Sequence, residues 1–196
     1  MLPPPRTSDT MAMPLAAHRF TVDEYHRMAE AGVFHEDDRL ELIDGLVVEM
    51  SPIGPRHAAC VDRLTRRLSQ QVGDRAIVRV QSPIVLGPDA APQPDLALLR
   101  PPIERYAHAH PQGPDILVVI EVADTSALYD RSVRLPLYAR AGIPEAWLVD
   151  LAGNAVSVCR RAGSNGYGET VTVTRGETLR PLLLPGVAVA VDEILG

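Results

Sequence analysis

The sequence contains no lysine, so all 19 of its basic residues are arginine. Acidic residues number 25, which gives a formal net charge of −6 and a pI of about 5.5. Proteins that coat nucleic acid without specificity carry a general basic surface, and this composition disfavours that class. A local cationic groove on an enzyme remains compatible with it.

Cysteine is scarce, and long apolar runs are absent. Cys60 and Cys159 lie far apart in apolar contexts, which indicates buried thiols in a reducing compartment rather than a disulfide framework. No run approaches the roughly 20 apolar residues that span a bilayer. The segment from Met11 to Ala17 lacks a basic start and is broken by Pro14, so it does not resemble a secretory signal. We expect a cytoplasmic protein without a membrane partner.

Several familiar catalytic motifs are missing as well, because the chain has no glycine-rich phosphate loop, nucleophile elbow or dinucleotide fingerprint. Its 196 residues and 46% hydrophobic content fit one globular domain, which we place at residues 19–196. Residues 1–18 are rich in proline and small side chains. They predict a disordered N-terminal extension.

The stretch from residue 116 to 150 has the clearest pattern. It opens with a continuous apolar run, Ile116 to Ile120, which is typical of a strand buried on both faces. The spacing then becomes helical, with Pro136 predicting a kink or a late helix start. Glu145 to Asp150 form a second apolar run, so the pattern predicts a right-handed βαβ unit. Tyr138 and Trp147, at helix and strand positions of this unit, are expected in the core. One carboxylate, Glu121, follows the first run directly, and burying it requires a cation or donors.

Weaker patterns fill in the rest of the chain. Thr21 and Glu24 form a capping box that opens a helix, and Asp44-Gly45 between alternating apolar residues predicts a hairpin. Further along the chain we expect a helix at 57–72 and strands at 76–80, at 84–86 and after Asp95. We also expect a hairpin that pairs 155–159 with 169–174, strands at 182–184 and 187–191, and a final helical turn at 192–195. The order predicts an α/β or α+β fold with a mixed sheet.

Asp95 and Glu121 are the candidate site. Each is a lone carboxylate that borders an apolar strand, and successive strands of such folds are usually neighbours, so the two side chains can meet at one end of the sheet. Paired carboxylates suit Mg²⁺ or Mn²⁺, which can activate water and offset charge on a phosphate. In the alternative interpretation, Asp95 is a turn residue and Glu121 pairs with an arginine.

An ordered set of short motifs resembles the Uma-type putative restriction endonuclease family of the PD-(D/E)XK nuclease superfamily. The motifs are ELIDG at 41–45, PRH at 55–57, QPD at 93–95, IEVADTS at 120–126, Asp130, Tyr138 and AGIPEAWLVD at 141–150. The resemblance covers residues 18–195. It implies a restriction-endonuclease-like αβββαβ core with an N-terminal helix and hairpin and a C-terminal β-hairpin.

The resemblance also implies roles for individual residues. Asp95 and Glu121 would hold the metal together with the Val122 carbonyl, and Glu41 would be an additional carboxylate. Where the superfamily has a lysine, this chain has Ala123. The family's lysine, four residues after an aspartate on the next helix, corresponds to Arg134. Arginine can stabilise a phosphate, but its pKa is too high for proton transfer.

Two function hypotheses follow. One is a Mg²⁺- or Mn²⁺-dependent endonuclease acting on DNA, with RNA as an alternative substrate and a homodimer among the open assembly states. The other is a catalytically impaired protein with a nuclease fold that acts as a nucleic-acid-binding or regulatory module. His57 at a helix start and the arginines of the same helix are weaker candidates for phosphate contact, against the simpler interpretation of a solvated flank. These arginines are Arg63, Arg66 and Arg67.

Overall fold

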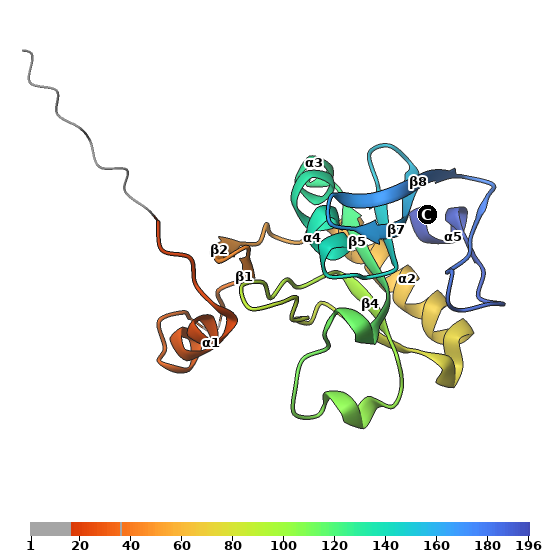
Figure 1. The fold of residues 1–196 in the computed structure, drawn as a ribbon. Coiled ribbons are helices and arrows are strands. Elements are labelled where there is room, and N and C mark those ends of the chain that lie inside the picture. Colours follow the sequence, from red (N-terminus) through yellow and green to blue (C-terminus); the bar gives the residue numbers. More distant parts are fainter. Residues whose placement is uncertain (1–16, 36) are drawn as a thin grey trace, which may run out of the picture.

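A computed structural model describes residues 17–35 and 37–196, and its central feature is a mixed six-stranded sheet with helices on both faces (Figure 1). The expected extension of residues 1–18 therefore lies almost wholly outside the described residues. The strand order is β3-β4-β5-β6-β7-β8. The strands span β3 Ile77–Val80, β4 Leu96–Leu99, β5 Ile116–Ala123, β6 Glu145–Asp150, β7 Ala155–Gly163 and β8 Gly166–Thr174.

The predicted βαβ unit is present. Strands β5 and β6 are parallel, with Glu121 opposite Leu148, and every other neighbouring pair in the sheet is antiparallel. The connection contains three helical pieces: α3 Ala127–Tyr129, the π-helical turn η4 Asp130–Arg134 and α4 Leu135–Arg140. Pro136 lies in the first turn of α4, which agrees with the expected late helix start. With α2 Pro55–Val72 ahead of β3, the elements follow the αβββαβ order.

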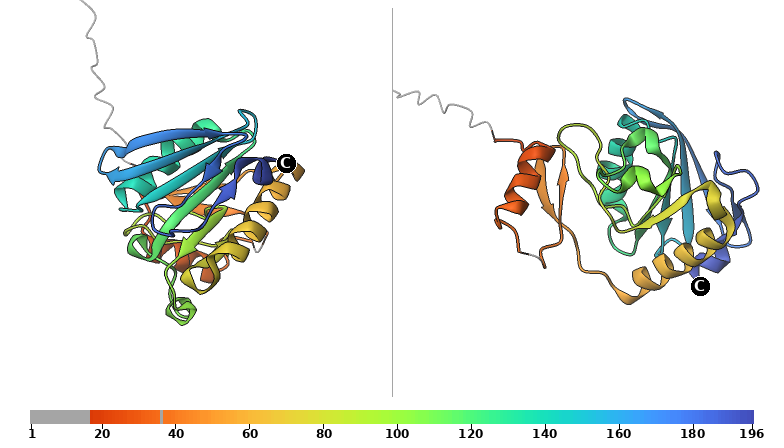
Figure 2. Two further views of the ribbon diagram at one scale, coloured as in Figure 1. Left: turned by 90° about the vertical axis from the view of Figure 1, so that its right-hand side faces the viewer. Right: turned by 90° about the horizontal axis from the view of Figure 1, so that it is seen from below.

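The two faces of the sheet bury separate apolar clusters (Figure 2). On one face, α2 and the short α5 Val191–Leu195 pack against alternate residues of the central strands. On the other, α4 and the loop between β3 and β4 cover the opposite set. Trp147 and Tyr138 are fully buried, as expected. Both cysteines are buried and free, and burial raises the pKa of Cys60 to about 12, so its thiol is inert at neutral pH.

The N-terminal part forms a separate layer beside the sheet (Figure 2). It consists of α1 Val22–Glu30, which has the expected capping box, and the hairpin β1 Leu40–Ile43 with β2 Leu46–Glu49. Two small strands, β9 Thr178–Leu179 and β10 Val189–Ala190, pair near the C-terminal end. Among the described residues, no helix has the length and apolar character needed to cross a bilayer.

Two predicted strands are wrong. Residues 84–86 contribute only an isolated bridge through Val85, and residues 182–184 form a turn. Both runs are three residues long and lie between prolines, which cannot donate to a ladder, and neither run finds a partner strand. Strand β9 was missed because it has only two residues.

A substitution at Gly113 tests how closely the chain packs against the end of α4, in the connection between β5 and β6. A Cβ at this position would collide with the carbonyl oxygen of Ala141 just after α4, whereas one at Gly168 on β8 would have an ordinary 3.5 Å neighbour. We expect Gly113→Ala to lower the free energy of unfolding by about 1–3 kcal/mol and Gly168→Ala to change it by less than about 0.5 kcal/mol. Urea denaturation measures both, and equal midpoints would show that this contact relaxes freely.

Candidate active site

Asp95 and Glu121 meet at one end of the sheet. Asp95 directly precedes β4 and Glu121 is the sixth residue of β5. The two strands are antiparallel, with Leu96 opposite Ile120, so the beginning of one lies beside the end of the other. Both carboxylates line the same cavity, which has a volume of about 480 Å³. The structure thus brings the two candidate ligands together.

Glu121 is 4% exposed and is held by two donors. Arg134 Nη1 donates to its Oε1 over 2.8 Å, and the Tyr138 hydroxyl donates to the same oxygen. Both bonds end on Oε1, and within the described residues no hydrogen bond to Oε2 is found. Burial raises the pKa of Glu121 to about 8, with Arg134 opposing the rise and Asp95 and Asp130 adding to it. The protonated form of this carboxyl group is therefore favoured at neutral pH.

Arg134 is the buried cation of the site. Its Nη2 lies 2.8 and 2.9 Å from the two carboxylate oxygens of Glu41, and its Nε lies 3.5 Å from Asp130 Oδ1. The π-helical turn places it there, since Leu135 N–H bonds to Asp130 C=O five residues back. Such turns often occur at functional sites. Burial acts to lower the pKa of Arg134, but the charge of Glu121 and the other neighbours raises it, so the guanidinium stays charged.

Three carboxyl groups share this one guanidinium. Glu41, which comes from β1, is 1% exposed and also accepts a 3.2 Å hydrogen bond from the backbone N–H of Gln93. Burial raises the pKa of both Glu41 and Asp130, and the charge of Arg134 opposes each rise. One positive charge cannot neutralise three carboxylates, so the cluster keeps a bound proton or attracts a further cation.

Asp95 has a different set of partners. Its Oδ2 accepts hydrogen bonds from the backbone N–H of Val122 at 2.9 Å and from His57 Nε2 at 3.0 Å, and its Oδ1 lies 3.3 Å from Gln81 Nε2. The hydrogen bond to Asp95 raises the pKa of His57. In a strand, the C=O of a residue points to the same side as its N–H, so the Val122 carbonyl also faces the Asp95 side.

The cavity carries a strong excess of negative charge. Its lining includes two arginines, Arg39 and Arg134, and six carboxylates: Glu41, Glu49, Asp95, Glu121, Asp124 and Asp130. Two buried polar atoms on its wall, His57 Nδ1 and the Tyr129 hydroxyl, have no hydrogen-bond partner in the described part of the chain. Unpaired polar atoms and excess carboxylates are what a cation or its water ligands would satisfy.

The donor set fits Mg²⁺ or Mn²⁺. Within residues 17–35 and 37–196, no three His, Cys, Asp or Glu side chains are grouped as a ready-made metal cage. Mg²⁺ does not need one, because it keeps several waters and takes one or two carboxylates. Asp95 and Glu121 are therefore the two candidate metal ligands. Glu41 is directed at Arg134, so the structure places it as a counter-ion of that residue.

The helix arginines have other partners. Arg63 donates to the backbone carbonyls of Ile194 and Leu195, and Arg67 forms a 3.0 Å ion pair with Glu193, so both hold α5 against α2. Arg66 is exposed. None of the three lines the cavity of Asp95. Of the weak nucleic-acid candidates, only His57 lies in it.

Some site residues were not predicted. Tyr138 was assigned to the core, yet its hydroxyl is a donor to Glu121. The signal was its position four residues after Arg134, on the same helix face. Arg39 and Gln93 also line the cavity, and neither stands out in sequence except by closeness to Glu41 and Asp95. Their positions depend on how the hairpin packs, which no local pattern encodes.

Comparisons with known proteins agree with this architecture. A family model described as "Uma2: Putative restriction endonuclease" matches residues 22–192. Among solved structures, a crystal structure from Anabaena variabilis, described as a putative nuclease belonging to DUF820, superposes with a TM-score of 0.70. It shares 16% sequence identity and covers 90% of this chain and 97% of its own, which shows a common fold. No curated protein matches the chain.

The raised pKa of Glu121 predicts a pH-dependent stability. Its folded-state value of about 8 exceeds its unfolded value, so the native protein binds the extra proton and loses stability as pH rises towards 8. We expect the free energy of unfolding to fall between pH 5 and 8 by up to ~1.4 kcal/mol per pH unit for this proton. Glu121→Gln should flatten the slope, and the exposed control Glu104→Gln should not. Parallel slopes for all three proteins in urea titrations would contradict the assignment.

Proposed function

The chain belongs to the Uma2 family of putative restriction endonucleases, and we propose that it is a Mg²⁺- or Mn²⁺-dependent endonuclease that hydrolyses DNA phosphodiester bonds. The observation that carries the proposal is the cavity itself, where six carboxylates face two arginines. A phosphodiester is an anion and would be repelled by this lining. A divalent cation held by Asp95 and Glu121 would reverse the local charge and make the approach favourable.

The reaction we infer is in-line attack of water on phosphorus. When bound, the divalent ion would supply an activated water and offset negative charge on the phosphate. Asp95 is oriented for this role by the Val122 N–H and His57, which hold one of its oxygens in place. Glu121 is oriented by Arg134 and Tyr138, which both bond one of its oxygens, and the residue lines the cavity. Fixed ligands of this kind need no reorganisation when the ion and substrate arrive.

Arg134 would act as a fixed charge behind the ligands. Its two ends contact Glu41 and Glu121, so the guanidinium cannot swing freely into the cavity. It would stabilise developing negative charge through space and keep Glu121 aligned. A proton-transfer role is excluded because the guanidinium remains charged.

The same contacts favour the alternative function, a nuclease fold that binds nucleic acid without cutting it. An arginine saturated by carboxylates is less available to a phosphate than a lysine on a flexible stem. The two functions differ in the response to metal and to Arg134 substitution, and the following experiments separate them.

Metal binding should raise the melting temperature. An ion that binds only the folded state at ten times its Kd adds about 1.4 kcal/mol, which corresponds to roughly 3–6 °C for a domain of this size. We expect this rise with Mg²⁺ or Mn²⁺ in the wild type and in Asp62→Asn, an exposed control on α2. Asp95→Asn should abolish it. An unchanged melting temperature in the wild type at millimolar metal would count against the site.

Cleavage should depend on the arginine cluster. With plasmid, single-stranded DNA and RNA as substrates, we expect Arg134→Ala to lower the metal-dependent rate by about 10²-fold or more, the scale for losing a preorganised charge. Arg134→Lys should be neutral or harmful. The neighbouring Arg131→Ala is a matched control, because Arg131 is exposed and pairs with Asp150.

Glu121→Ala provides the blank for this assay, and circular dichroism checks that each variant is folded. A wild-type rate equal to the blank, with activity appearing in Arg134→Lys, would identify an impaired nuclease. Preferential cleavage of RNA would correct the substrate and leave the reaction in place.

A further inference from the structure

The two arginines of the cavity differ in how their charge is balanced. Arg134 is buried and contacts Glu41, Glu121 and Asp130. Arg39 is half-buried, and within the described residues no carboxylate comes within ion-pair distance of it. Within the described residues, its one side-chain hydrogen bond joins Nη1 to the backbone carbonyl of Ser51 at 2.8 Å. A guanidinium has five N–H donors, so most of the donors of Arg39 have no partner in that part of the chain.

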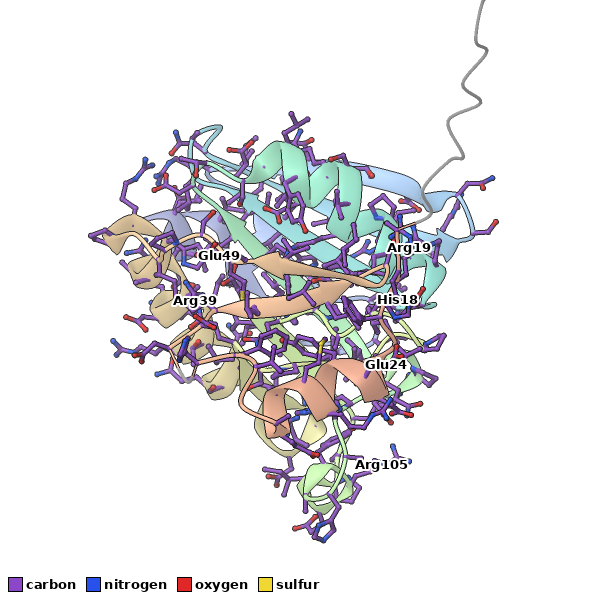
Figure 3. The ribbon with its side chains drawn as sticks, turned by 90° about the vertical axis from the view of Figure 1, so that its left-hand side faces the viewer. His18, Arg19, Glu24, Arg39, Glu49 and Arg105 are labelled. Atoms are coloured by element: carbon purple, nitrogen blue, oxygen red, sulfur yellow. The ribbon has the colours of Figure 1, made fainter. Side chains whose placement is uncertain are left out.

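Arg39 is also well placed. It immediately precedes β1, and its own carbonyl accepts a 2.7 Å hydrogen bond from Met50 N–H at the end of β2. Figure 3 shows Arg39 and Glu49 together at one end of the hairpin, while His18 and Arg19 lie at the other. Both labelled residues at the first end line the cavity of Asp95 and Glu121.

Arg39 shares a cavity with the candidate metal ligands. Asp95 and Glu121 line that cavity, and so does His57, which contacts Asp95 over 3.0 Å. A phosphate bound by Arg39 would therefore be close to the ligands.

We propose that Arg39 is a substrate-binding residue that holds a phosphate of the nucleic-acid strand at the mouth of this cavity. The proposal rests on the proposed function for the kind of substrate and deepens it by naming the contact. An arginine that is half-buried and has no ion-pair partner among residues 17–35 and 37–196 suits bidentate phosphate binding. The other arginine of the cavity is already occupied by carboxylates. In the competing interpretation, Arg39 only fastens the segment around Ser51.

Binding measurements distinguish these roles. Fluorescence anisotropy of a labelled duplex would be recorded over a range of salt concentrations, with and without millimolar Ca²⁺ to fill oxygen-ligand sites. We expect Arg39→Gln to weaken binding about tenfold and to reduce the slope of log K against log salt by about one. Arg39→Lys should keep the slope and recover part of the affinity.

Arg100→Gln is the matched control. Arg100 likewise bonds a backbone carbonyl, that of Pro114 at 3.0 Å, and has no ion pair in the described part of the chain, but it lies at the opposite end of β4 from Asp95. Arg100→Gln should leave the slope of log K against log salt unchanged. A slope in Arg39→Gln equal to that of wild type, with only the melting temperature lowered, would overturn the proposal in favour of the fastening role. Absence of any duplex binding by the wild type would also overturn it.

Cleavage kinetics keep this test apart from that of the proposed function. If the wild type cleaves and Arg39→Gln raises KM with little change in kcat, both hold. If the wild type cleaves and Arg39→Gln leaves KM and binding unchanged, the Arg39 contact is wrong and the nuclease function stands. If the wild type binds but does not cleave, a binding loss in Arg39→Gln still supports the contact while the catalytic proposal fails.

Discussion

The buried guanidinium of Arg134 is the interaction on which the site depends. It joins the π-helical turn to strand β5 through Glu121, 13 residues before it, and to the hairpin through Glu41, 93 residues before it. Through Glu41 it ties the N-terminal hairpin to the sheet, although that hairpin is not one of the sheet's strands. Removing one member of such a buried cluster leaves the other charges unpaired, which typically costs 3–5 kcal/mol. Together with the backbone hydrogen bonds that join Leu42 to Ala91 and Gly45 to Asp89, this contact holds the hairpin in place.

This geometry suits arginine at position 134, where the resemblance noted in the sequence implies a lysine. The guanidinium reaches both oxygens of Glu41 with one nitrogen and Glu121 with the other. A single ammonium group could not span these two carboxylates in the same arrangement. The whole chain lacks lysine, so the arginine at this position belongs to a general use of arginine as the basic residue.

The sequence was informative where the signal was local. The run before Glu121, the capping box at Thr21 and the turn at Asp44-Gly45 each encode one element, and all three elements are present. The pairing of Asp95 with Glu121 followed from strand adjacency. What could not be predicted was the partner of Glu41, because its direction depends on how a two-stranded hairpin packs on the crossover. Of the two interpretations of Glu121, the pairing with an arginine is seen in its bond to Arg134, and the role as a metal ligand stays a prediction.

Arg134 and Arg39 differ in their electrostatic roles in the cavity because they are buried to different extents. Deep in the site, a fixed cation lowers the cost of keeping carboxylates together but has little charge left for a substrate. Arg39 is only half-buried, and among the described residues its side chain bonds one carbonyl, so its charge costs less to hold and stays available. Under the proposed function, a strand entering this cavity would meet this arginine and the carboxylates, whose repulsion a divalent ion would offset. The proposed metal dependence would then follow from the composition of the lining.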